Sequence, residues 1–484
     1  MSKFDVKALK GLTLDSRQVK DGYLFGAFPG ATLDGRDYIE AAIQNGAVAV
    51  LAPEGTVLPG LGLEKDVELM TDENPRRLFA QMAAEFYGQQ PKTIVAVTGT
   101  NGKTSCVYFV KQLWGALEFK AASIGTLGVR GPEMIKSASM TTPDPVSLQG
   151  ALADMAAVGI THLAMEASSH GLDQYRLDGV KVSAAAFTNL SRDHLDYHGD
   201  MESYFAAKAR LFSELVVDGG TAVLNADIEE FAKLKDIAEA RGLKIISFGE
   251  KGEQLKLLET TPHTHGQHVV FEAFGEHVEL DLPLVGNFQV MNVLCSLGLV
   301  LAADHKWDNA FVAALENLQG APGRLQLVKG HPVGAAVYVD YAHTPDALQT
   351  VLEALRPHTP NKLSVVFGCG GDRDRGKRPM MGEIAEKFAD SVIVTDDNPR
   401  NEKASLIRAD VMKGTPSATE VGDRAEAINE GIKVLSEGDV LVIAGKGHEQ
   451  GQIFADHTAA FDDYEEAEKA ISQLREATKE EKVS

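Results

Sequence analysis

A glycine-rich turn that ends in Gly-Lys-Thr constrains the fold of this chain more than any other segment. Residues 98–104 read Thr-Gly-Thr-Asn-Gly-Lys-Thr; they follow the apolar run 94–97, and the next residues, 105–113, have helical character. A strand, a glycine-rich turn and a helix in this order surround one small space with backbone N–H groups, which bind phosphate. Lys103 can reach the terminal phosphates of a nucleotide, and the Thr104 hydroxyl can hold Mg²⁺. The segment therefore predicts a nucleotide-binding α/β domain.

The general phosphate-loop pattern has a glycine at the position of Val97, so this chain carries a shortened form of the pattern. A glycine-rich connection without a ligand is the alternative interpretation. Gly-Lys-Thr stands at the junction of the strand and the helix, and this placement favours the phosphate site.

Composition narrows the class of protein. With 484 residues the chain is too long for one ordinary core, and about two to four domains are expected. The net charge is −22 and no run of Lys and Arg occurs, which argues against nucleic-acid binding and leaves local donors to hold any anionic ligand. The three cysteines are scattered and predict neither a disulfide framework nor a metal cluster. No signal peptide and no apolar run of about 18 residues occurs, so we expect a cytoplasmic protein.

Two breaks divide the chain into three parts, which we expect to be domains at 1–90, 91–321 and 322–484. The breaks lie near 86–91 and 319–324, which contain Gly, Pro and Gln. The second and third parts alternate apolar strands with helical stretches, and this rhythm predicts mainly parallel sheets covered by helices. The expected strands are 23–25 and 47–51 in the first part, 94–97, 162–165, 184–188 and 222–225 in the second, and 336–340, 363–367, 391–395 and 440–444 in the third.

Polar segments follow two strands of the second part. Glu166 comes directly after one strand, and the segment 189–198, Asn-Leu-Ser-Arg-Asp-His-Leu-Asp-Tyr-His, follows the other. Because the carboxyl ends of parallel strands meet at one edge, Glu166 is expected to face the same rim as the phosphate loop, where it can bind Mg²⁺. The ionisable groups of 189–198 can build a second metal site. A helix cap near Glu166 and a solvated loop at 189–198 are the alternative interpretations.

Lys208 lies on the apolar face of a predicted helix. Asp200 can cap a helix over 201–212, and the helical period places Lys208 beside Tyr204 and Phe212. A lysine at such a position ordinarily extends its amine to solvent, and the pattern alone favours this interpretation. Burial would instead lower the pKa of the lysine and leave a neutral amine, which can react with CO₂ to give a carbamate.

In the third part, successive strands end in charged segments at 340–345, 368–379, 396–402 and 444–449. Arg binds a carboxylate through two parallel hydrogen bonds, and arginines near Glu449 and Asp396 suit a zwitterion such as an amino acid. Each of these charges taken alone is more typical of a surface salt bridge. Four strands that end in this way favour a binding edge.

Segments spread over nearly the whole chain together resemble the ATP-dependent Mur ligase family of peptidoglycan synthesis. They are Thr-Gly-Thr-Asn-Gly-Lys-Thr (98–104), Thr-Thr-Pro-Asp (141–144), Glu-Ala-Ser-Ser-His-Gly-Leu (166–172), the segment 189–198, Gly-Asn-Phe-Gln-Val-Met-Asn (286–292), Asp-Tyr-Ala-His-Thr-Pro (340–345) and Gly-Lys-Gly-His-Glu (445–449). Within the family, the chain is most similar to members that add the third residue of the stem peptide to UDP-N-acetylmuramoyl-L-alanyl-D-glutamate. Members with Asp-Asn-Pro-Arg use meso-diaminopimelate, and this chain has that sequence at 397–400.

The resemblance implies an α/β fold with an N-terminal UDP-binding domain, a central P-loop-type ATPase domain with a mainly parallel sheet, and a C-terminal Rossmann-like domain. It implies an ATP-dependent amide ligase that forms an acyl phosphate, uses Mg²⁺, and serves cell-wall growth, cell shape and cell division. The implied partners are ATP, meso-diaminopimelate and the UDP-linked muramoyl-dipeptide, without nucleic acid and without membrane insertion.

The resemblance also implies roles for individual residues. The implied catalytic group is Lys103, Glu166, His194 and a carbamylated Lys208. The implied Mg²⁺ contacts, direct or through water, are Thr104, Glu166, His194 and Lys208. The implied ATP contacts are Gly99, Thr100, Asn101, Gly102, Lys103 and Thr104 in the loop, Asn287 and Asn292 near adenine, and Arg324, Asp340 and His343. The implied contacts of the UDP-linked substrate are Ser16 at the uridine diphosphate end and Thr141, Thr142, Ser168 and Arg176 at the muramoyl-dipeptide. The implied diaminopimelate contacts are Arg373, Asn398, Arg400, Gly445 and Glu449.

Two other functions stay open on the sequence. A ligase of the folate polyglutamate type belongs to the same superfamily, and Thr-Thr-Pro-Asp and Asp-Asn-Pro-Arg argue against it. A nucleotide-binding regulator without turnover is the alternative from another class. The presence of Lys103, Lys208, Glu166 and Glu449 opposes it.

Overall fold

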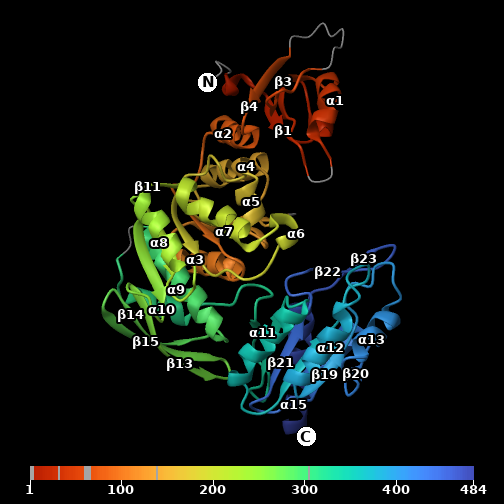
Figure 1. Ribbon diagram of the computed structural model, residues 1–484. Helices are drawn as coiled ribbons and strands as arrows, with labels where there is room; N and C mark the ends of the chain where they lie inside the picture. The colour runs from red at the N-terminus through yellow and green to blue at the C-terminus, as the bar shows by residue number, and fades with distance from the viewer. Residues whose placement is uncertain (1–4, 31–32, 59–66, 138–139, 304–305, 484) are drawn as a thin grey trace. The chain divides into compact units, whose positions relative to one another are not determined.

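The computed structural model describes residues 5–30, 33–58, 67–137, 140–303 and 306–483 (Figure 1). The chain forms two compact units. The first unit comprises Met1–Phe248 and Cys295–Lys306, and the second comprises Gly249–Leu294 and Trp307–Ser484. Among the described residues, no helix combines the length and the apolar character that a membrane span requires.

The first unit begins with a small parallel sheet in the order β1-β2-β3-β4. Its strands are β1 (Gly11–Thr13), β2 (Tyr23–Gly26), β3 (Ala47–Pro53) and β4 (Glu68–Asp72), and its helices are α1 (Ile39–Gln44) and α2 (Pro75–Tyr87). Neighbouring residues of β2 serve opposite faces, as the period of a strand requires. Leu24 packs in the apolar cluster that contains Phe79 of α2, and Phe25 packs in the cluster that contains Ile39 of α1.

A larger sheet occupies the rest of the first unit, with strands in the order β12-β11-β10-β5-β9-β6-β7-β8. The strands from β12 to β6 run parallel, and β7 and β8 are antiparallel additions at the edge. The strands are β5 (Thr93–Thr98), β6 (Ala121–Gly125), β7 (Gly128–Gly131), β8 (Met134–Lys136), β9 (His162–Glu166), β10 (Val182–Phe187), β11 (Val216–Asn225) and β12 (Lys244–Gly249). The helices are α3 (Lys103–Ala116), α4 (Pro145–Ala157), α5 (Ser169–Asp173), α6 (Leu195–His198), α7 (Met201–Arg210) and α8 (Phe231–Ala240).

The central strand of this sheet explains where the functional residues gather. β5 lies between β9 and β10, with Val97 paired to Glu166 and Thr98 paired to Phe187. The carboxyl ends of the three strands are therefore level. All residues of β5 but the first are buried, as expected for a parallel strand covered on both faces.

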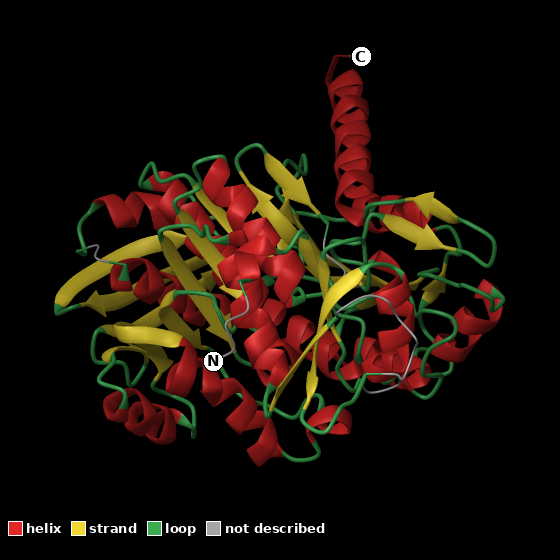
Figure 2. Cartoon of the chain, turned by 90° about the horizontal axis from the view of Figure 1, so that it is seen from above, coloured by secondary structure: helices red, strands yellow, loops and turns green. Residues whose placement is uncertain are grey.

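The second unit contains a parallel sheet in the order β16-β17-β21-β18-β19-β20, in which only the edge strand β16 is antiparallel. Its strands are β16 (Gln326–Val328), β17 (Ala336–Asp340), β18 (Leu363–Phe367), β19 (Ser391–Val394), β20 (Thr419–Glu420) and β21 (Val440–Ala444). The helices are α11 (Pro345–Leu355), α12 (Lys377–Phe388), α13 (Ala404–Met412), α14 (Arg424–Lys433) and α15 (Asp463–Val483), and α15 leads to the C-terminus marked in Figure 2.

Antiparallel strands complete the second unit. β13 (Leu255–His263), β14 (Gly266–Ala273) and β15 (Glu276–Leu282) form a meander, and β22 (Gly451–Ile453) pairs with β23 (Thr458–Ala460). α9 (Asn287–Ala302) and α10 (Ala310–Glu316) follow the meander along the chain.

The structure confirms the strands and the α/β class predicted from the sequence. β17, β18 and β21 have the predicted bounds, β11 begins at Val216 where the prediction began at Ala222, and the other predicted strands differ by one or two residues at one or both ends. The meander β13–β15 was not predicted, although its residues alternate between buried and exposed, which is the pattern of a strand with one solvent face. The proposed division into three domains at residues 90 and 321 stays a prediction.

Candidate functional site

The phosphate loop joins β5 to α3 in a conformation that requires two of its glycines. Gly99 has φ +142° and Gly102 has φ +87°, and both values lie in the region that glycine tolerates best. A Cβ on Gly99 would lie 2.0 Å from the Thr188 hydroxyl oxygen, so the loop passes directly against the end of β10. Gly102 is the N-cap of α3 and provides no side-chain cap. The N–H groups of the first turn are therefore suited to an anion.

Lys103 is held by the loop it belongs to. Its Nζ donates to the carbonyl oxygens of Gly99 at 2.9 Å and Thr100 at 2.8 Å. The Thr100 hydroxyl donates to the Ser191 carbonyl at 3.2 Å and lies 3.3 Å from the Tyr204 hydroxyl. The loop is thus tied to the segment that follows β10, and the Lys103 ammonium lies against the loop's own carbonyl groups.

Lys208 is buried, with 1% of its surface exposed. Asp200 caps α7 by accepting from the Ser203 N–H at 2.7 Å, and the helix carries Lys208 inward so that Nζ donates to the Gly99 carbonyl at 2.8 Å. The Lys208 Nζ lies 4.4 Å from the centre of the Tyr204 ring. Burial, together with the nearby charge of Lys103, lowers the pKa of Lys208 to about 6. The lysine is therefore largely uncharged at neutral pH, and the interpretation that its amine reaches solvent is wrong.

Glu166 is buried at the end of β9, with 1% of its surface exposed. Its Oε1 accepts from the Thr126 N–H at 2.8 Å, and its Oε2 accepts from the Thr126 hydroxyl at 3.3 Å. That hydroxyl lies 3.1 Å from the Thr141 hydroxyl. The backbone of β6 approaches so closely that a Cβ on Gly125 would lie 2.1 Å from Oε1. The carboxylate is therefore held in one orientation.

Thr142 and Ser168 form a small network with the backbone of Glu166. The Thr142 hydroxyl donates to the Glu166 carbonyl at 2.9 Å and accepts from the N–H and the hydroxyl of Ser168, each at 3.0 Å. The Ser168 hydroxyl also caps α5 by accepting from the Gly171 N–H at 3.1 Å. The structure thus brings Glu166, expected at the rim of the sheet, together with Thr141, Thr142 and Ser168, which the resemblance assigned to the UDP-linked substrate.

His194 belongs to a cluster of aromatic rings. It has φ +53° at the start of α6, its ring centre lies 4.8 Å from that of His170, and Tyr204 lies at 6.3 Å. His198 lies 5.1 Å from Tyr204. Among the described residues, no group of three or more His, Cys, Asp or Glu side chains converges on a metal position. A second metal site built by the segment 189–198 alone is therefore not seen among the described residues.

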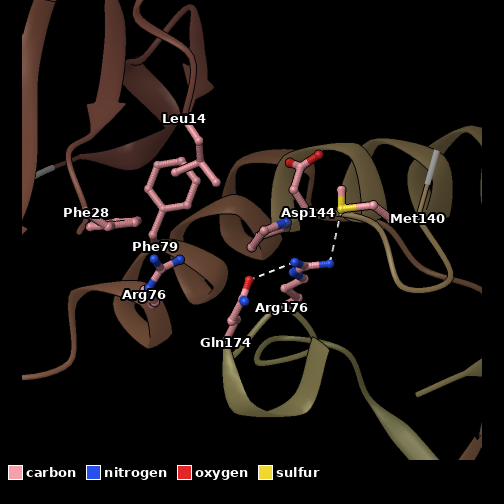
Figure 3. Close-up of a pocket in the computed structure, with 9 residues that line it drawn as sticks. Leu14, Phe28, Arg76, Phe79, Met140, Asp144, Gln174 and Arg176 are labelled. Carbon is pink, nitrogen blue, oxygen red and sulfur yellow. Dashed lines mark hydrogen bonds between the residues drawn. The ribbon is translucent and has the colours of Figure 1, made fainter. Parts of the chain in front are cut away.

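A pocket in the first unit lies beside this network and contains two arginines (Figure 3). Arg176 donates to the Thr142 carbonyl and to the Gln174 side chain, both at 2.7 Å. Arg76, in the first turn of α2, donates to the Pro29 carbonyl at 2.6 Å. Burial lowers the pKa of both guanidiniums, and neither forms an ion pair with the carboxylates of the described residues.

The apolar walls of the pocket include Leu14, Phe28 and Phe79, and its other polar lining residues are Asp144 and Gln174 (Figure 3). Two partly desolvated cations beside apolar walls suit a ligand that combines anionic and apolar groups. The sequence analysis missed Arg76, although Asn74-Pro75-Arg76 carries a clear helix-start signal. Ser16 is buried in a short helical turn (Ser16–Gln18) and does not line this pocket.

In the second unit, Asp340 is the last residue of β17, and its carboxylate binds backbone groups that come before and after this strand. Its carboxylate accepts from the N–H groups of Leu325 and Ala342, both at 2.8 Å, and burial raises its pKa, although Arg324 opposes this rise. The Arg324 guanidinium lies 5.0 Å from the centre of the Tyr341 ring.

The other residues of the second unit that the resemblance assigns to ATP contact different groups from those that Asp340 binds. The His343 carbonyl accepts from Lys377 at 2.7 Å, and Nδ1 of His343 lies 2.9 Å from the Tyr341 carbonyl. Asn292 is buried and donates to Gln289 at 3.0 Å, whereas Asn287 is the first residue of α9.

Asn398 and Glu449 meet at the carboxyl edge of the second parallel sheet. The Asn398 Nδ2 donates to the Glu449 Oε2 at 3.0 Å, and the buried Lys446 lies between them. Arg400 has φ +52°, and its guanidinium donates to the Gly371 carbonyl at 2.9 Å. Arg373 is exposed and donates to the adjacent Asp372 carbonyl at 3.1 Å. The sequence analysis missed Lys446, which the flanking glycines of Gly-Lys-Gly could have indicated.

Comparison with known proteins adds independent information. Three family models match the chain: the Mur ligase family catalytic domain at residues 8–87, the Mur ligase middle domain at 97–300, and the Mur ligase glutamate ligase domain at 323–447. A UDP-N-acetylmuramoyl-L-alanyl-D-glutamate–2,6-diaminopimelate ligase of Caulobacter vibrioides is 54% identical, covering 96% of this chain and 95% of the relative. The ligase of the same name from Rhizobium meliloti is 50% identical, covering 96% and 94%. A solved structure of a ligase with this name is 36% identical with a TM-score of 0.73, covering 96% of this chain and 95% of that one.

Proposed function

The chain belongs to the Mur ligase family, and from this membership we propose that it joins meso-diaminopimelate to UDP-N-acetylmuramoyl-L-alanyl-D-glutamate at the expense of ATP. The reaction forms an amide bond in the synthesis of peptidoglycan and takes place in the cytoplasm. We further propose domain bounds of 1–90 for binding the UDP end, 91–321 for ATP and 322–484 for the amino acid.

The chemistry requires an activated acyl group, because a carboxylate is a poor acceptor for an amine. The glutamyl γ-carboxylate attacks the γ-phosphorus of ATP, which gives an acyl phosphate and ADP. The neutral amine of diaminopimelate then attacks the acyl carbon, and the tetrahedral intermediate expels phosphate. Two anions approach each other in the first step, so cationic groups must offset their repulsion.

The phosphate loop and its neighbours supply these groups. Lys103 leaves the two loop carbonyls to contact the γ-phosphate, and the N–H groups of α3 contact the other phosphates. The Thr104 hydroxyl and the fixed Glu166 carboxylate are oxygen donors of the kind Mg²⁺ prefers, and Mg²⁺ keeps waters and substrate phosphates as further ligands. The residues present therefore fit the ion, which would supply positive charge at the transferred phosphoryl group.

Lys208 is proposed to act as a carbamate. Its uncharged amine adds to CO₂ and loses one proton, which converts a buried base into an anion. The carbamate and His194 would complete the oxygen and nitrogen donors around Mg²⁺, directly or through water. The position of Nζ against the Gly99 carbonyl is the observation that carries this assignment, because it places the modified group at the phosphate loop.

The remaining residues are assigned to the two other substrates. Arg176, Thr141, Thr142 and Ser168 would bind the muramoyl-dipeptide, and Ser16 would lie towards the uridine diphosphate. Asn398, Arg400, Gly445, Glu449 and Arg373 would bind diaminopimelate. Asn287, Asn292, Arg324, Asp340 and His343 would contact ATP, with Gly99, Thr100, Asn101 and Gly102 at its phosphates.

A phosphate-release assay tests the proposal. The purified protein is incubated with Mg²⁺–ATP, with or without the UDP-linked dipeptide, and with each of a panel of amino acids. We expect release only when both the dipeptide and meso-diaminopimelate are present. Release that does not depend on the amino acid, preference for L-lysine, or no release under any combination would each contradict the proposal.

A further inference from the structure

The lysine of Gly445-Lys446-Gly447 occupies a position that the proposed function does not use. Gly445 has φ +115° and Gly447 has φ +57°, so the chain turns on both sides of Lys446 immediately after β21. A Cβ on Gly447 would lie 2.7 Å from the Tyr341 Cβ, which leaves no room for a side chain there. This turn buries Lys446 completely, with 0% of its surface exposed.

The Lys446 ammonium contacts three side chains. Nζ donates to the Asn398 Oδ1 at 2.9 Å, and it lies 3.4 Å from the Asp397 Oδ1 and 3.4 Å from the Glu449 Oε2. These partners come from the loop after β19 and from the turn after β21. One buried cation therefore links two loops and offsets the repulsion between two carboxylates.

These contacts determine the orientation of the Asn398 amide and of the Glu449 carboxylate. The Asn398 Oδ1 accepts from Lys446 and from the Ile453 N–H at 2.9 Å, so its Nδ2 is directed to Glu449. All the hydrogen bonds of the Glu449 carboxylate within the described residues go to Oε2. Oε1 is left to accept from a ligand, and the side chain of Glu449 is 36% exposed.

We propose that Lys446 is a positioning residue for the amino-acid substrate: it sets the orientation of Asn398 and Glu449 so that Glu449 receives an ammonium group of the substrate. This inference rests on the proposed function. Lys446 does not itself touch the substrate, because its ammonium is fully buried and directed to three protein acceptors. Its effect is therefore expected on the KM for the amino acid and not on the KM for ATP.

The test compares Lys446→Met with the matched control Lys433→Met in the same unit, since Lys433 is an exposed lysine in the last turn of α14. Removing a charged hydrogen-bond donor from this set is expected to raise the KM for diaminopimelate by about 10- to 100-fold. The KM values of Lys446→Met for ATP and for the UDP-linked dipeptide are expected to stay within about twofold of those of the unmodified protein. Lys433→Met is expected to match the unmodified protein in all three.

A second measurement separates positioning from a general loss of structure. In a double-mutant cycle with Glu449→Gln, Lys446→Met should add little to the rise in KM, because both changes remove the same interaction. Additive effects would overturn the inference, as would an unchanged KM for diaminopimelate in Lys446→Met or a parallel rise in the KM for ATP. If Lys446→Met does not fold, Lys446→Gln takes its place in the cycle. Diaminopimelate-dependent phosphate release by the unmodified protein is measured first, and its absence would reject the proposed function and not the role of Lys446.

Discussion

The Gly99 carbonyl accepts hydrogen bonds from both Lys103 at 2.9 Å and Lys208 at 2.8 Å. Burial imposes a desolvation cost on the charged form of Lys208, and the nearby Lys103 ammonium adds repulsion. The lowered pKa of Lys208, about 6, follows from both effects. A residue that the sequence pattern assigns to solvent is thus a buried, largely uncharged amine that contacts the glycine-rich loop.

Replacing Lys208 tests the proposed carbamate. Lys208→Ala should lower kcat by about 10²- to 10³-fold, because a group that would hold Mg²⁺ at the transferred phosphoryl group is lost. Short carboxylates such as formate or acetate should restore part of the rate, whereas chloride at the same ionic strength should not. Full activity of the variant without additives would contradict the assignment.

The lowered pKa of Lys208 also predicts a dependence of stability on pH. Between pH 6 and the ordinary pKa of lysine, 10.5, the unfolded chain binds a proton at Lys208 that the folded chain does not. The free energy of unfolding therefore rises with pH through this window and is flat with respect to this group below it. Lys208→Met should lose that slope in denaturant unfolding of the ligand-free protein in CO₂-free buffer. An identical slope in both proteins would show that Lys208 is charged in the folded state.

Arg400 is predicted to select meso-diaminopimelate over L-lysine, which lacks the second carboxylate. A site that pairs this carboxylate with a guanidinium leaves the cation unpaired when lysine binds, at a cost of about 2–5 kcal/mol. Arg400→Ala should raise the KM for diaminopimelate, leave the KM for ATP nearly unchanged, and reduce the discrimination against lysine. Arg373→Ala serves as the comparison, and retention of full preference by Arg400→Ala would assign the distal carboxylate to another residue.

At the scale of elements, the phosphate loop depends on backbone geometry that only glycine provides. Gly99→Ala would place a Cβ 2.0 Å from the Thr188 hydroxyl oxygen at φ +142°. The loop of the variant must shift, and restoring the ATP-binding conformation would cost about 1–3 kcal/mol of backbone strain. This cost corresponds to a loss of about 5- to 150-fold in ATP affinity. Gly115→Ala in α3 is the control, since nothing lies within 4 Å of the added Cβ. It should bind ATP normally and stabilise the helix by about 1 kcal/mol, and equal ATP affinity in both variants would refute the role of Gly99.

The parallel strands and the antiparallel meander differ in how well the sequence predicts them. Strands β18 and β21 are buried along their whole length, and their bounds are those predicted from their largely apolar sequences. The strands β14 and β15 of the meander alternate polar and apolar residues over much of their length, and a search for apolar runs alone does not identify them. A search for period-two alternation would have found them.

At the scale of the whole molecule, the two compact units are expected to respond differently to nucleotide. Each unit has its own apolar clusters, so unfolding need not be a single transition. A non-hydrolysable ATP analogue with Mg²⁺ at a concentration 100 times Kd should stabilise the folded protein by about 2.7 kcal/mol. We expect a larger shift in the transition of the first unit, which holds the phosphate loop, than in that of the second unit, which holds the proposed contacts Arg324, Asp340 and His343. Differential scanning calorimetry measures this shift, and Lys103→Met should reduce it. A shift of equal size in Lys103→Met would show that the phosphate loop is not the site of binding.

The sequence by itself determined the α/β class, the phosphate loop and most strands, because each depends on residues that are neighbours along the chain. Only the tertiary structure decided the burial and lowered pKa of Lys208, the presence of both Arg76 and Arg176 in one pocket, and the position of Lys446 between Asn398 and Glu449. These properties depend on segments that lie far apart in the sequence, such as α2 and the end of α5. Burial and hydrogen-bond partners set the charge and orientation of a side chain, and both are fixed when the chain folds.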